Sequence, residues 1–99
     1  MNEPKLTLDE KGQGAFTIVA EGEQLGEMVV AVSDSNLTVY HTEVMPKAEG
    51  QGLAKTLLNA MVTYARSQNL KVIPLCPYVH AQFKRHPEAY EDIWNKAEQ

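Results

Sequence analysis

Residues 37–67 read LTVYHTEVMPKAEGQGLAKTLLNAMVTYARS, and the hydrophobic period of this stretch changes in its middle. Before Pro46 the stretch is rich in β-branched and aromatic residues, which is typical of a β-strand. After Gly52 the apolar residues recur at helical spacing, which is typical of an amphipathic helix. Gly50 and Gly52 stand where the period changes, so the stretch predicts a strand, a tight glycine turn and a helix.

The glycine turn places backbone N–H groups at the start of the helix, where they lack intrahelical partners. These groups converge at the positive end of the helix dipole and suit an anion such as phosphate. Gly50-Gln51-Gly52 therefore predicts the binding of a phosphorylated cofactor. The alternative is that the two glycines serve only to make the turn.

The helix after the turn is predicted to span residues 53–67 and to lie on a sheet. Its apolar stripe has the width of a helix face packed on one side and consists of Leu53, Ala54, Leu57, Leu58, Met61, Val62 and Ala65. Gln68 and Asn69 end the helix, and the apolar residues 71–76 predict a further strand. Because the helix forms a long crossover, this strand is expected to run parallel to the one before the turn.

The remaining segments complete an α+β fold. Alternating residues predict strands over residues 5–9, 15–20 and 27–32, which form an antiparallel meander with the strand of residues 37–45. Downstream, residues 78–86 predict a short helix. Pro87 is well placed to open a last helix that runs to about residue 97. The predicted buried residues of that helix are Tyr90, Ile93 and Trp94.

The composition fits one compact domain. With 99 residues, of which 43% are hydrophobic, the chain has room for one domain over residues 1–99. No window approaches the about 20 apolar residues of a membrane span, and the first residues lack the apolar region of a signal peptide. Cys76 is the only cysteine and has no partner for an internal disulfide. We therefore expect a soluble cytoplasmic protein.

The formal net charge of -4 is unevenly distributed. Residues 1–43 carry eight acidic and two basic residues, whereas residues 44–99 carry five acidic and seven basic ones. A mildly basic half tolerates an anionic cofactor, and an acidic half attracts an amine or a basic peptide. An ordinary mixed surface in solvent explains the acidic half equally well. The basic residues are too few and too scattered to predict a nucleic-acid surface.

The order of these segments resembles the GNAT N-acetyltransferases, whose acetyl-CoA motif has the form Gln/Arg-x-x-Gly-x-Gly/Ala. Four segments together look like the very small single-domain subfamily of GNAT-like proteins, and the match covers most of the chain: His41–Val44, Gly50–Ala54, Pro74–Tyr78 and Arg85–Pro87. The glycine motif alone is moderately specific, and the four segments in this order are much more so. The resemblance implies an acyl-CoA N-acyltransferase fold that binds acetyl-CoA or coenzyme A.

The resemblance also implies how the cofactor would be held. Backbone amides of the turn would cradle the pyrophosphate, and the pantetheine arm would lie between the strand that ends near Val44 and the strand that ends at Cys76. Lys47 stands in the slot usually held by Gln or Arg, so the positive charge is kept but the planar fork is lost. The expected cofactor-binding residues are Val44, Lys47, Ala48, Glu49, Gly50, Gln51, Gly52, Leu53, Ala54, Tyr78, Phe83 and Lys84. The 3′-phosphate is within the expected reach of His80, Lys84 and Arg85, although a plain surface helix is the better explanation of any one of them.

Acetyl transfer needs a group that takes a proton from the amine and a group that returns one to the leaving thiolate. Glu43 is a candidate base, and His41 lies on the same face of a regular strand; a solvent-facing polar pair is the competing explanation. Cys76, held between two prolines, is a candidate carrier of the acetyl group or else an inert small hydrophobe. Tyr78 is a weaker candidate for the acid that returns a proton to the CoA thiolate.

The chain is shorter than a typical domain of about 150 residues, and the helical segment that walls the acceptor site in larger family members is absent. The acceptor side is therefore expected to be open. One hypothesis is an acetyl-CoA-dependent N-acetyltransferase that acts on an unidentified amine at an open or partner-completed acceptor site, which suits an amine on a protein. The other is a non-catalytic CoA-binding module that acts through a protein partner. We expect a monomer or a weak dimer and no metal ion.

Overall fold

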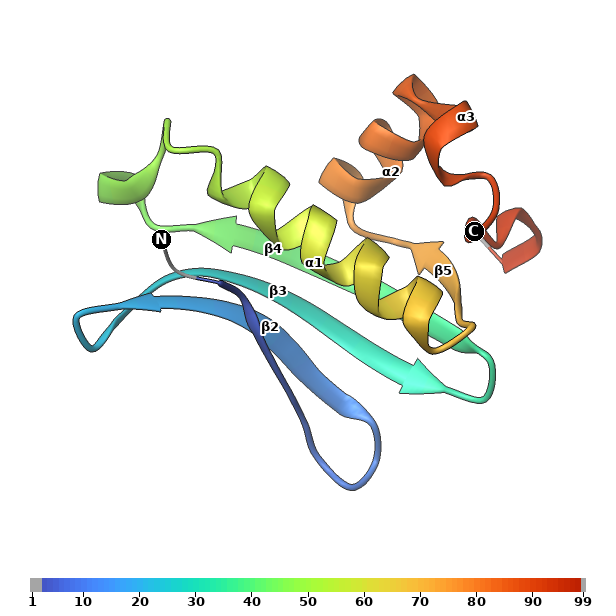
Figure 1. The fold of residues 1–99 in the computed structure, drawn as a ribbon, viewed down its shortest axis with the longest axis horizontal. Helices are drawn as coiled ribbons and strands as arrows, with labels where there is room; N and C mark the ends of the chain where they lie inside the picture. Colours follow the sequence, from blue (N-terminus) through green and yellow to red (C-terminus); the bar gives the residue numbers. More distant parts are fainter. Residues whose placement is uncertain (1–2, 99) are drawn as a thin grey trace.

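A computed structural model of the chain describes residues 3–98 and shows a five-stranded mixed sheet (Figure 1). Strands that are neighbours in sequence are neighbours in the sheet. Strands β1 to β4 form an antiparallel meander, and β5 runs parallel to β4. The strands are β1 (Lys5–Leu8), β2 (Gln13–Ala20), β3 (Glu23–Ser33), β4 (Asn36–Val44) and β5 (Lys71–Pro74). The predicted α+β architecture is confirmed.

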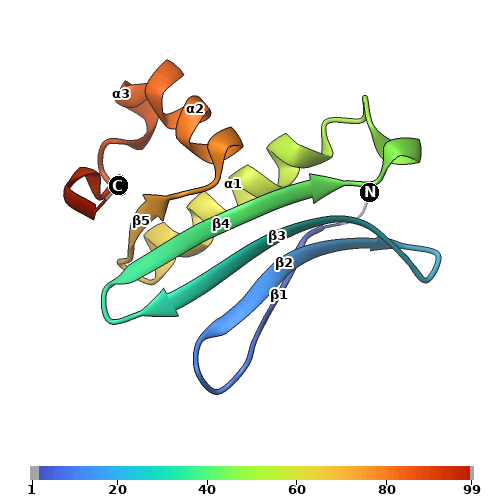
Figure 2. The same cartoon turned by 180° about the vertical axis from the view of Figure 1, so that it is seen from behind.

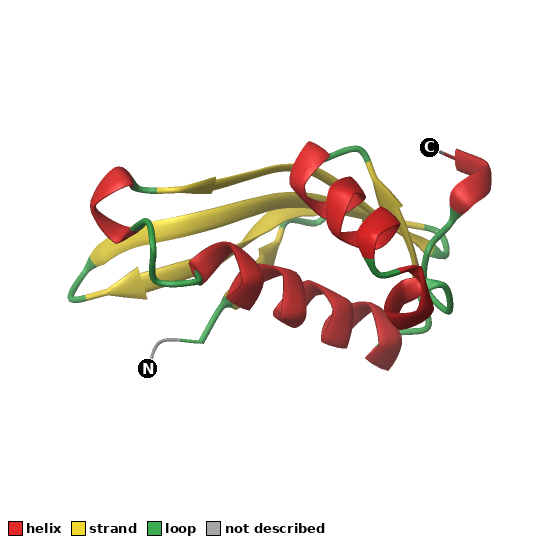
Figure 3. Ribbon diagram, turned by 90° about the horizontal axis from the view of Figure 1, so that it is seen from above, coloured by secondary structure: helices red, strands yellow, loops and turns green. Residues whose placement is uncertain are grey.

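The helices occupy one face and one edge of the sheet. Helix α1 (Leu53–Ser67) contacts β2, β3 and β4 and covers one face, and α2 (Pro77–Arg85) contacts β4 and β5 (Figures 1 and 3). The short elements are η1 (Pro46–Ala48), α3 (Pro87–Tyr90) and η2 (Lys96–Glu98). Seen from behind, the other face of the sheet is not covered by any helix of residues 3–98 (Figure 2). None of the helices in this range is long and apolar enough to cross a membrane.

The core lies between the sheet and α1. The covered side of the sheet, here called the helix face, presents the buried residues Phe16, Ile18, Met28, Val30, Leu37, Val39 and Val72. Helix α1 contributes Leu57, Leu58, Met61, Val62 and Ala65, which belong to the predicted stripe. The opposite side, here called the open face, presents residues that are all partly or fully exposed: Ala15, Thr17, Val19, Glu27, Val29, Ala31, Thr38, Tyr40, His41, Glu43, Ile73 and Leu75.

Strand β4 contains a β-bulge at Tyr40. Val30 of β3 pairs with Val39, and Val29 pairs with His41. The register between β3 and β4 therefore skips Tyr40. As a result Tyr40 and His41 are both exposed although they are consecutive. After the bulge Thr42 lies on the helix face and Glu43 on the open face. An extra residue of this kind bends a strand and increases its twist.

Strands β4 and β5 separate after a short parallel ladder. The ladder ends at the pair Val39 and Pro74, and the Leu75 N–H donates to the Ile73 carbonyl of its own strand at 3.1 Å. The Cys76 N–H donates one further bond to the Val39 carbonyl at 2.8 Å. Strand β5 is therefore shorter than the predicted strand over residues 71–76, and residues 40–44 of β4 extend beyond it.

The predicted last helix over residues 87–97 is wrong. Helix α3 spans only four residues, and the chain then runs along β5 through a parallel bridge between Val72 and Trp94. The Val72 N–H donates to the Ile93 carbonyl at 2.5 Å, and the Asn95 N–H donates to the Val72 carbonyl at 2.9 Å. These bonds satisfy the outer edge of β5, which a helix would leave unpaired. The residues predicted to face the core are buried or half-buried nonetheless: Tyr90, Ile93 and Trp94.

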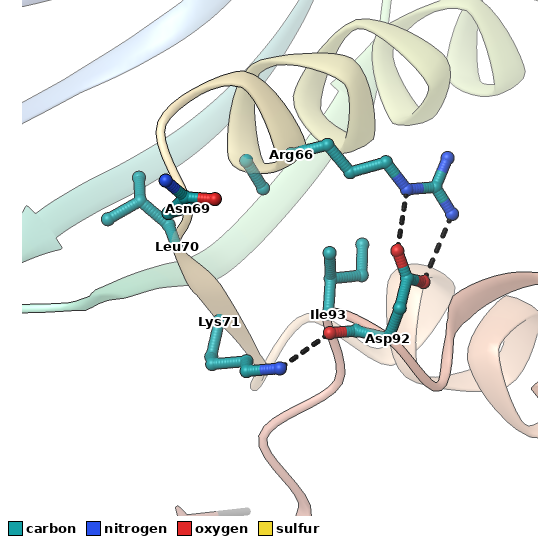
Figure 4. A pocket seen from close by; sticks show the side chains of 7 residues that line it. Arg66, Asn69, Leu70, Lys71, Asp92 and Ile93 are labelled. Atoms are coloured by element: carbon teal, nitrogen blue, oxygen red, sulfur yellow. Dashed lines mark hydrogen bonds and ion pairs between the residues drawn. The ribbon is translucent and has the colours of Figure 1, made fainter.

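An ion pair holds the C-terminal segment against α1 (Figure 4). Arg66 donates from Nε and Nη2 to the Asp92 carboxylate at 2.9 and 3.2 Å, and from Nη2 to the Ala89 carbonyl at 2.7 Å. Lys71 Nζ donates to the main-chain carbonyl of Asp92 at 2.6 Å. These side chains border a hollow of about 460 Å³ near the end of α1 that is remote from the glycine turn. The hollow therefore belongs to a structural contact.

Asp92→Asn is expected to destabilise the protein by about 0.2–1 kcal/mol at neutral pH, the range of exposed ion pairs. The hydrogen bond from Arg66 lowers the pKa of Asp92 below its ordinary value of 3.8. A carboxylate with a lowered pKa stabilises the fold above its unfolded pKa and loses this effect as the pH falls through its folded pKa. Urea unfolding should show the difference at neutral pH and not in strong acid. Glu91→Gln, the exposed neighbour, is the control; an equal loss at both pH values in Asp92→Asn would contradict the ion pair.

Candidate active site

The turn between β4 and α1 forms a small hollow at the start of the helix. Gly50 and Gly52 have positive φ angles of 89° and 75°, a conformation that glycine adopts more readily than other residues. Gly52 is the N-cap residue of α1. The hollow has a volume of about 240 Å³ and is lined by Val44, Ala48, Glu49, Gly50, Gly52, Leu53 and Ala54. All of these residues belong to the set expected to bind the cofactor.

The hollow has the chemistry of an anion site. Within the described chain, α1 begins without a side-chain cap and without an acidic residue in its first turn. Its first N–H groups are therefore available at the positive end of the helix dipole. A Cβ added at Gly50 or Gly52 would meet no atom of residues 3–98 within 4 Å. The space beside both glycines is thus open to a ligand, and a side chain there would project into it.

Lys47 and Gln51, two further residues expected to bind the cofactor, do not line this hollow as the structure describes it. Lys47 Nζ forms an ion pair with Glu23 at the start of β3. Both side chains are well exposed, and an exposed pair is worth about 1 kcal/mol or less. The pairing with Glu23 therefore leaves Lys47 free to exchange this partner for an anion.

The expected cofactor residues of α2 divide into a surface group and a core residue. A second hollow of about 500 Å³ is lined by Pro77, His80, Ala81, Lys84 and Arg85. Phe83, in contrast, is 0% exposed and stacks on Tyr90 with ring centroids 4.7 Å apart. Phe83 packs in the core and offers no surface to a cofactor.

His41 and Glu43 lie together on the open face of β4. His41 Nε2 is 3.4 Å from Glu43 Oε1, and the two side chains are 57% and 69% exposed. The strand alternation after the bulge places them on one face, as the sequence predicts. A carboxylate and an imidazole are thus within contact of each other and of solvent.

Cys76 lies at the gap between β4 and α2. The residue is 2% exposed and is the N-cap residue of α2. Its Sγ is 3.3 Å from the hydroxyl oxygen of Thr42, which lies on the helix face of β4. This contact joins the two elements just beyond the end of the ladder between β4 and β5. The thiol is therefore packed inside the structure, while the side chains of His41 and Glu43 face solvent.

Tyr78 is half-buried at the start of α2. Burial raises the pKa of Tyr78 above its ordinary value of 10.0, and the neighbouring Tyr90 and Cys76 raise this pKa further. A phenol with a raised pKa keeps its proton at neutral pH. Tyr78 therefore has the protonation state of a proton donor.

Comparisons with known proteins agree with this geometry. The model of the family described as GCN5-related N-acetyl-transferase matches residues 15–93, a span that includes the glycine turn, His41, Glu43 and Cys76. The chain belongs to this family. A search of curated proteins found no match.

Solved structures share the fold of this GCN5-related domain. A GCN5-like protein from Staphylococcus aureus is 29% identical, with 91% of this chain and 86% of that chain covered and a TM-score of 0.66. The ribosomal-protein-S18-alanine N-acetyltransferase from Escherichia coli is 16% identical, with 67% of this chain and 43% of that chain covered and a TM-score of 0.61. A ribosomal-protein-alanine N-acetyltransferase from Brucella melitensis is 19% identical, with 92% and 66% covered and a TM-score of 0.61. At these low identities, the two ribosomal-protein acetyltransferases show that the fold is shared and nothing about the activity of this chain.

In this GCN5-related domain, two residues of the site are not apparent from sequence patterns. Thr42 contacts Cys76 although 34 positions separate them, and Glu27 pairs with Glu43 across β3 and β4. Strand alternation places Thr42 opposite His41, but the register between distant strands has no local signal. Among residues 3–98, no group of three or more His, Cys, Asp and Glu side chains is arranged to hold a metal ion.

Proposed function

We propose that the protein transfers an acetyl group from acetyl-CoA to an amine. One arrangement of strand β4 supports this proposal. The glycine hollow lies at the end of β4, the pair of His41 and Glu43 lies on its open face, and its ladder with β5 stops at Val39. A cofactor that enters from the helix face and an amine that approaches from the open face would meet at this strand.

The turn is the proposed holder of the cofactor pyrophosphate. The backbone N–H groups of residues 50–54 would donate to the phosphate oxygens, since the two glycines allow close approach of the backbone; those of Ala48 and Glu49 already donate to the carbonyls of Met45 and Pro46. Lys47 would exchange Glu23 for the phosphates and add positive charge. The basic residues that border the hollow of α2 would contact the 3′-phosphate: His80, Lys84 and Arg85. Acetyl-CoA, when bound, supplies a thioester carbonyl that an amine can attack.

Glu43 is the proposed general base on the open face. Its carboxylate is 69% exposed and accessible to an amine or to an intervening water. His41, at 3.4 Å, orients this carboxylate through Nε2. Tyr78, half-buried at the start of α2, is the proposed acid, and its phenol oxygen carries a proton at neutral pH that it can give to the leaving thiolate.

Cys76 is the alternative carrier of the acetyl group. Its 2% exposure and its contact with Thr42 favour a packing role, so direct transfer to the amine is the preferred mechanism. The open face also suits a second function, a CoA-binding protein that acts through a partner and has no acceptor of its own.

A calorimetric titration with CoA and acetyl-CoA is the first test. Binding is expected for both ligands, and a failure of both to bind would contradict the enzyme and the binding module together. If acetyl-CoA binds but no amine stimulates CoA release, the binding module is the better description.

Intact-mass analysis after incubation with acetyl-CoA tests the role of Cys76. We expect no acetyl group on the protein, and Cys76→Ala and Cys76→Ser variants that keep CoA binding and most of the turnover. A mass gain of one acetyl group that disappears in Cys76→Ala would instead make Cys76 the acyl carrier.

A further inference from the structure

Strand β1 forms one edge of the sheet, and no strand of residues 3–98 pairs with its outer side (Figure 2). At the end of β1, the Asp9 N–H donates to the Gln13 carbonyl of β2 at 2.8 Å. Because every second residue of an antiparallel pair bonds to the partner strand, the odd-numbered residues of β1 bond to β2. The backbone N–H and C=O groups of Leu6 and Leu8 therefore point outward, where another strand can bond to them.

An open apolar groove of about 540 Å³ lies beside this edge, on the helix face of the sheet. Its lining includes Leu6 of β1, Phe16 of β2, and Ala60 and Tyr64 of α1. Leu6 and Leu8 are only partly buried and pack against the margin of the core, since α1 lies over β2, β3 and β4. A strand added at β1 would cover both the backbone edge and the two leucines.

The sequence of this edge is complementary to itself in one antiparallel register. When Thr7 lies opposite Thr7 of a second copy, Leu6 lies opposite Leu8, and Lys5 lies opposite Asp9. Each of the two leucine pairs then exchanges both of its N–H···O bonds. The leucines meet on the helix face, and the threonine and ion pairs meet on the open face. Cross-strand pairs of these kinds stabilise a sheet.

Other registers of the same two strands are unfavourable. A shift of two residues in one direction places Lys5 opposite Lys11, and the same shift in the other direction places Glu3 opposite Asp9. Like charges directly opposite each other destabilise a sheet. A shift of one residue sets the leucines opposite residues whose backbone groups already bond to β2. In the register centred on Thr7, by contrast, Glu3 is aligned with Lys11, so the charges favour this register.

The sheet offers such an edge once within residues 3–98. At the other edge, the backbone of Val72 in β5 is already bonded to Ile93 and Asn95. A contact that uses the same strand of both copies closes as a twofold dimer and does not extend into a filament. Pro4, which has no N–H group, precedes β1 and keeps the shared ladder short. These features favour a closed, reversible pair of copies over an extended assembly.

We propose that two copies of the chain pair antiparallel along β1 about a twofold axis at Thr7 and form one continuous sheet with both α1 helices on the same face. The occupant of the edge and of the adjoining groove is thus a second copy of this chain. Two strands separate β1 from β4, so the glycine turn and the open face of β4 stay accessible in both copies. This inference does not depend on the proposed function.

Sedimentation velocity over a range of protein concentrations tests the dimer directly. The average mass is expected to rise with concentration from 11.0 kDa toward twice this value, with or without CoA. A mass that stays at that of the monomer up to about 1 mM, the range of very weak association, would overturn the proposal. The edge would then be left to a strand of a different protein.

Thr7→Lys and Thr7→Glu test the register, because Thr7 is exposed and lies on the proposed axis. Each variant alone brings two like charges together and should raise the dissociation constant of the dimer about two- to fivefold. An equimolar mixture of the two variants sets an ammonium opposite a carboxylate and should dimerise more tightly than either variant alone. A folding defect does not explain such a recovery. Ser35→Lys, in the exposed turn between β3 and β4, adds the same charge elsewhere and should dimerise like the wild type.

The results that contradict this register differ from those that contradict the dimer itself. A wild-type dimer that both Thr7 variants leave unchanged would show that another surface joins the copies. A mixture that dimerises no better than the single variants would show that Thr7 does not face Thr7 across the axis. An equal weakening in Ser35→Lys would show that net charge, and not the β1 edge, controls association. Each of these outcomes overturns the assignment.

Discussion

Replacing Glu43 by glutamine is expected to lower kcat/KM for acetylation of an amine by about 10²–10⁴-fold, the usual contribution of a general base. Glutamine keeps the size of the side chain but loses the oxygen that accepts the proton. Glu43 is 69% exposed and lies on the face opposite the glycine hollow. Folding and CoA affinity should therefore be unchanged. The measurement is the rate of CoA release at saturating acetyl-CoA, with calorimetry of CoA binding on the same sample.

His41→Gln is the companion variant, since His41 contacts Glu43 without being the proposed base. Its loss of activity should be smaller than that of Glu43→Gln, because the carboxylate remains and loses only its orienting partner. Full activity in Glu43→Gln would show that another group takes the proton. A loss of CoA affinity in parallel with activity would show that the substitution disturbs the cofactor turn instead of the chemistry.

The turn and the crossover helix are predictable because their signals are local. A change of hydrophobic period around Gly50 and Gly52 depends only on neighbouring residues, and so do the bounds of the helix that follows. The same holds for the joint exposure of His41 and Glu43, which follows from strand alternation. These features cover the hollow beside the glycine turn and one face of the proposed site.

The C-terminal segment shows where local signals fail. Residues 87–97 have a favourable helix start at Pro87, yet the backbone pairs with Val72 instead. An unpaired strand edge offers hydrogen bonds to Ile93 and Asn95, and this tertiary contact outweighs a weak helix preference. The position of the edge depends on the whole sheet, so sequence spacing within the segment does not contain it.

The bulge at Tyr40 is also not predictable from the sequence pattern, and it affects the proposed site more than the C-terminal segment does. It shifts the alternation of β4, so that His41 pairs with Val29 and Thr42 faces Cys76. Without the extra residue, the side chains after position 40 would exchange faces. The separation of the proposed cofactor side from the proposed acceptor side at β4 therefore depends on one residue whose effect appears only in the folded sheet.

Gly52→Ala is expected to weaken CoA binding by about 10- to 100-fold, which corresponds to the loss of one charge-assisted hydrogen bond of about 1.5–3 kcal/mol. Gly52 has a φ of 75° at the start of α1, and an alanine in this left-handed conformation costs about 1–2 kcal/mol. Its methyl group would also project into the space proposed for the pyrophosphate. Calorimetry with CoA measures the affinity, and urea unfolding measures the strain.

Gly22→Ala separates the strain from the loss of the ligand. Gly22 has a φ of 79°, and a Cβ at Gly22, as at Gly52, would meet no atom of the described chain within 4 Å. The two substitutions should therefore destabilise the fold by similar amounts. Of the two glycines, Gly52 lines the hollow and Gly22 does not, so only Gly52→Ala should lose CoA affinity. Equal CoA affinities in the two variants would show that the turn of residues 50–54 does not hold the pyrophosphate, and the cofactor would then have to bind at another part of the surface.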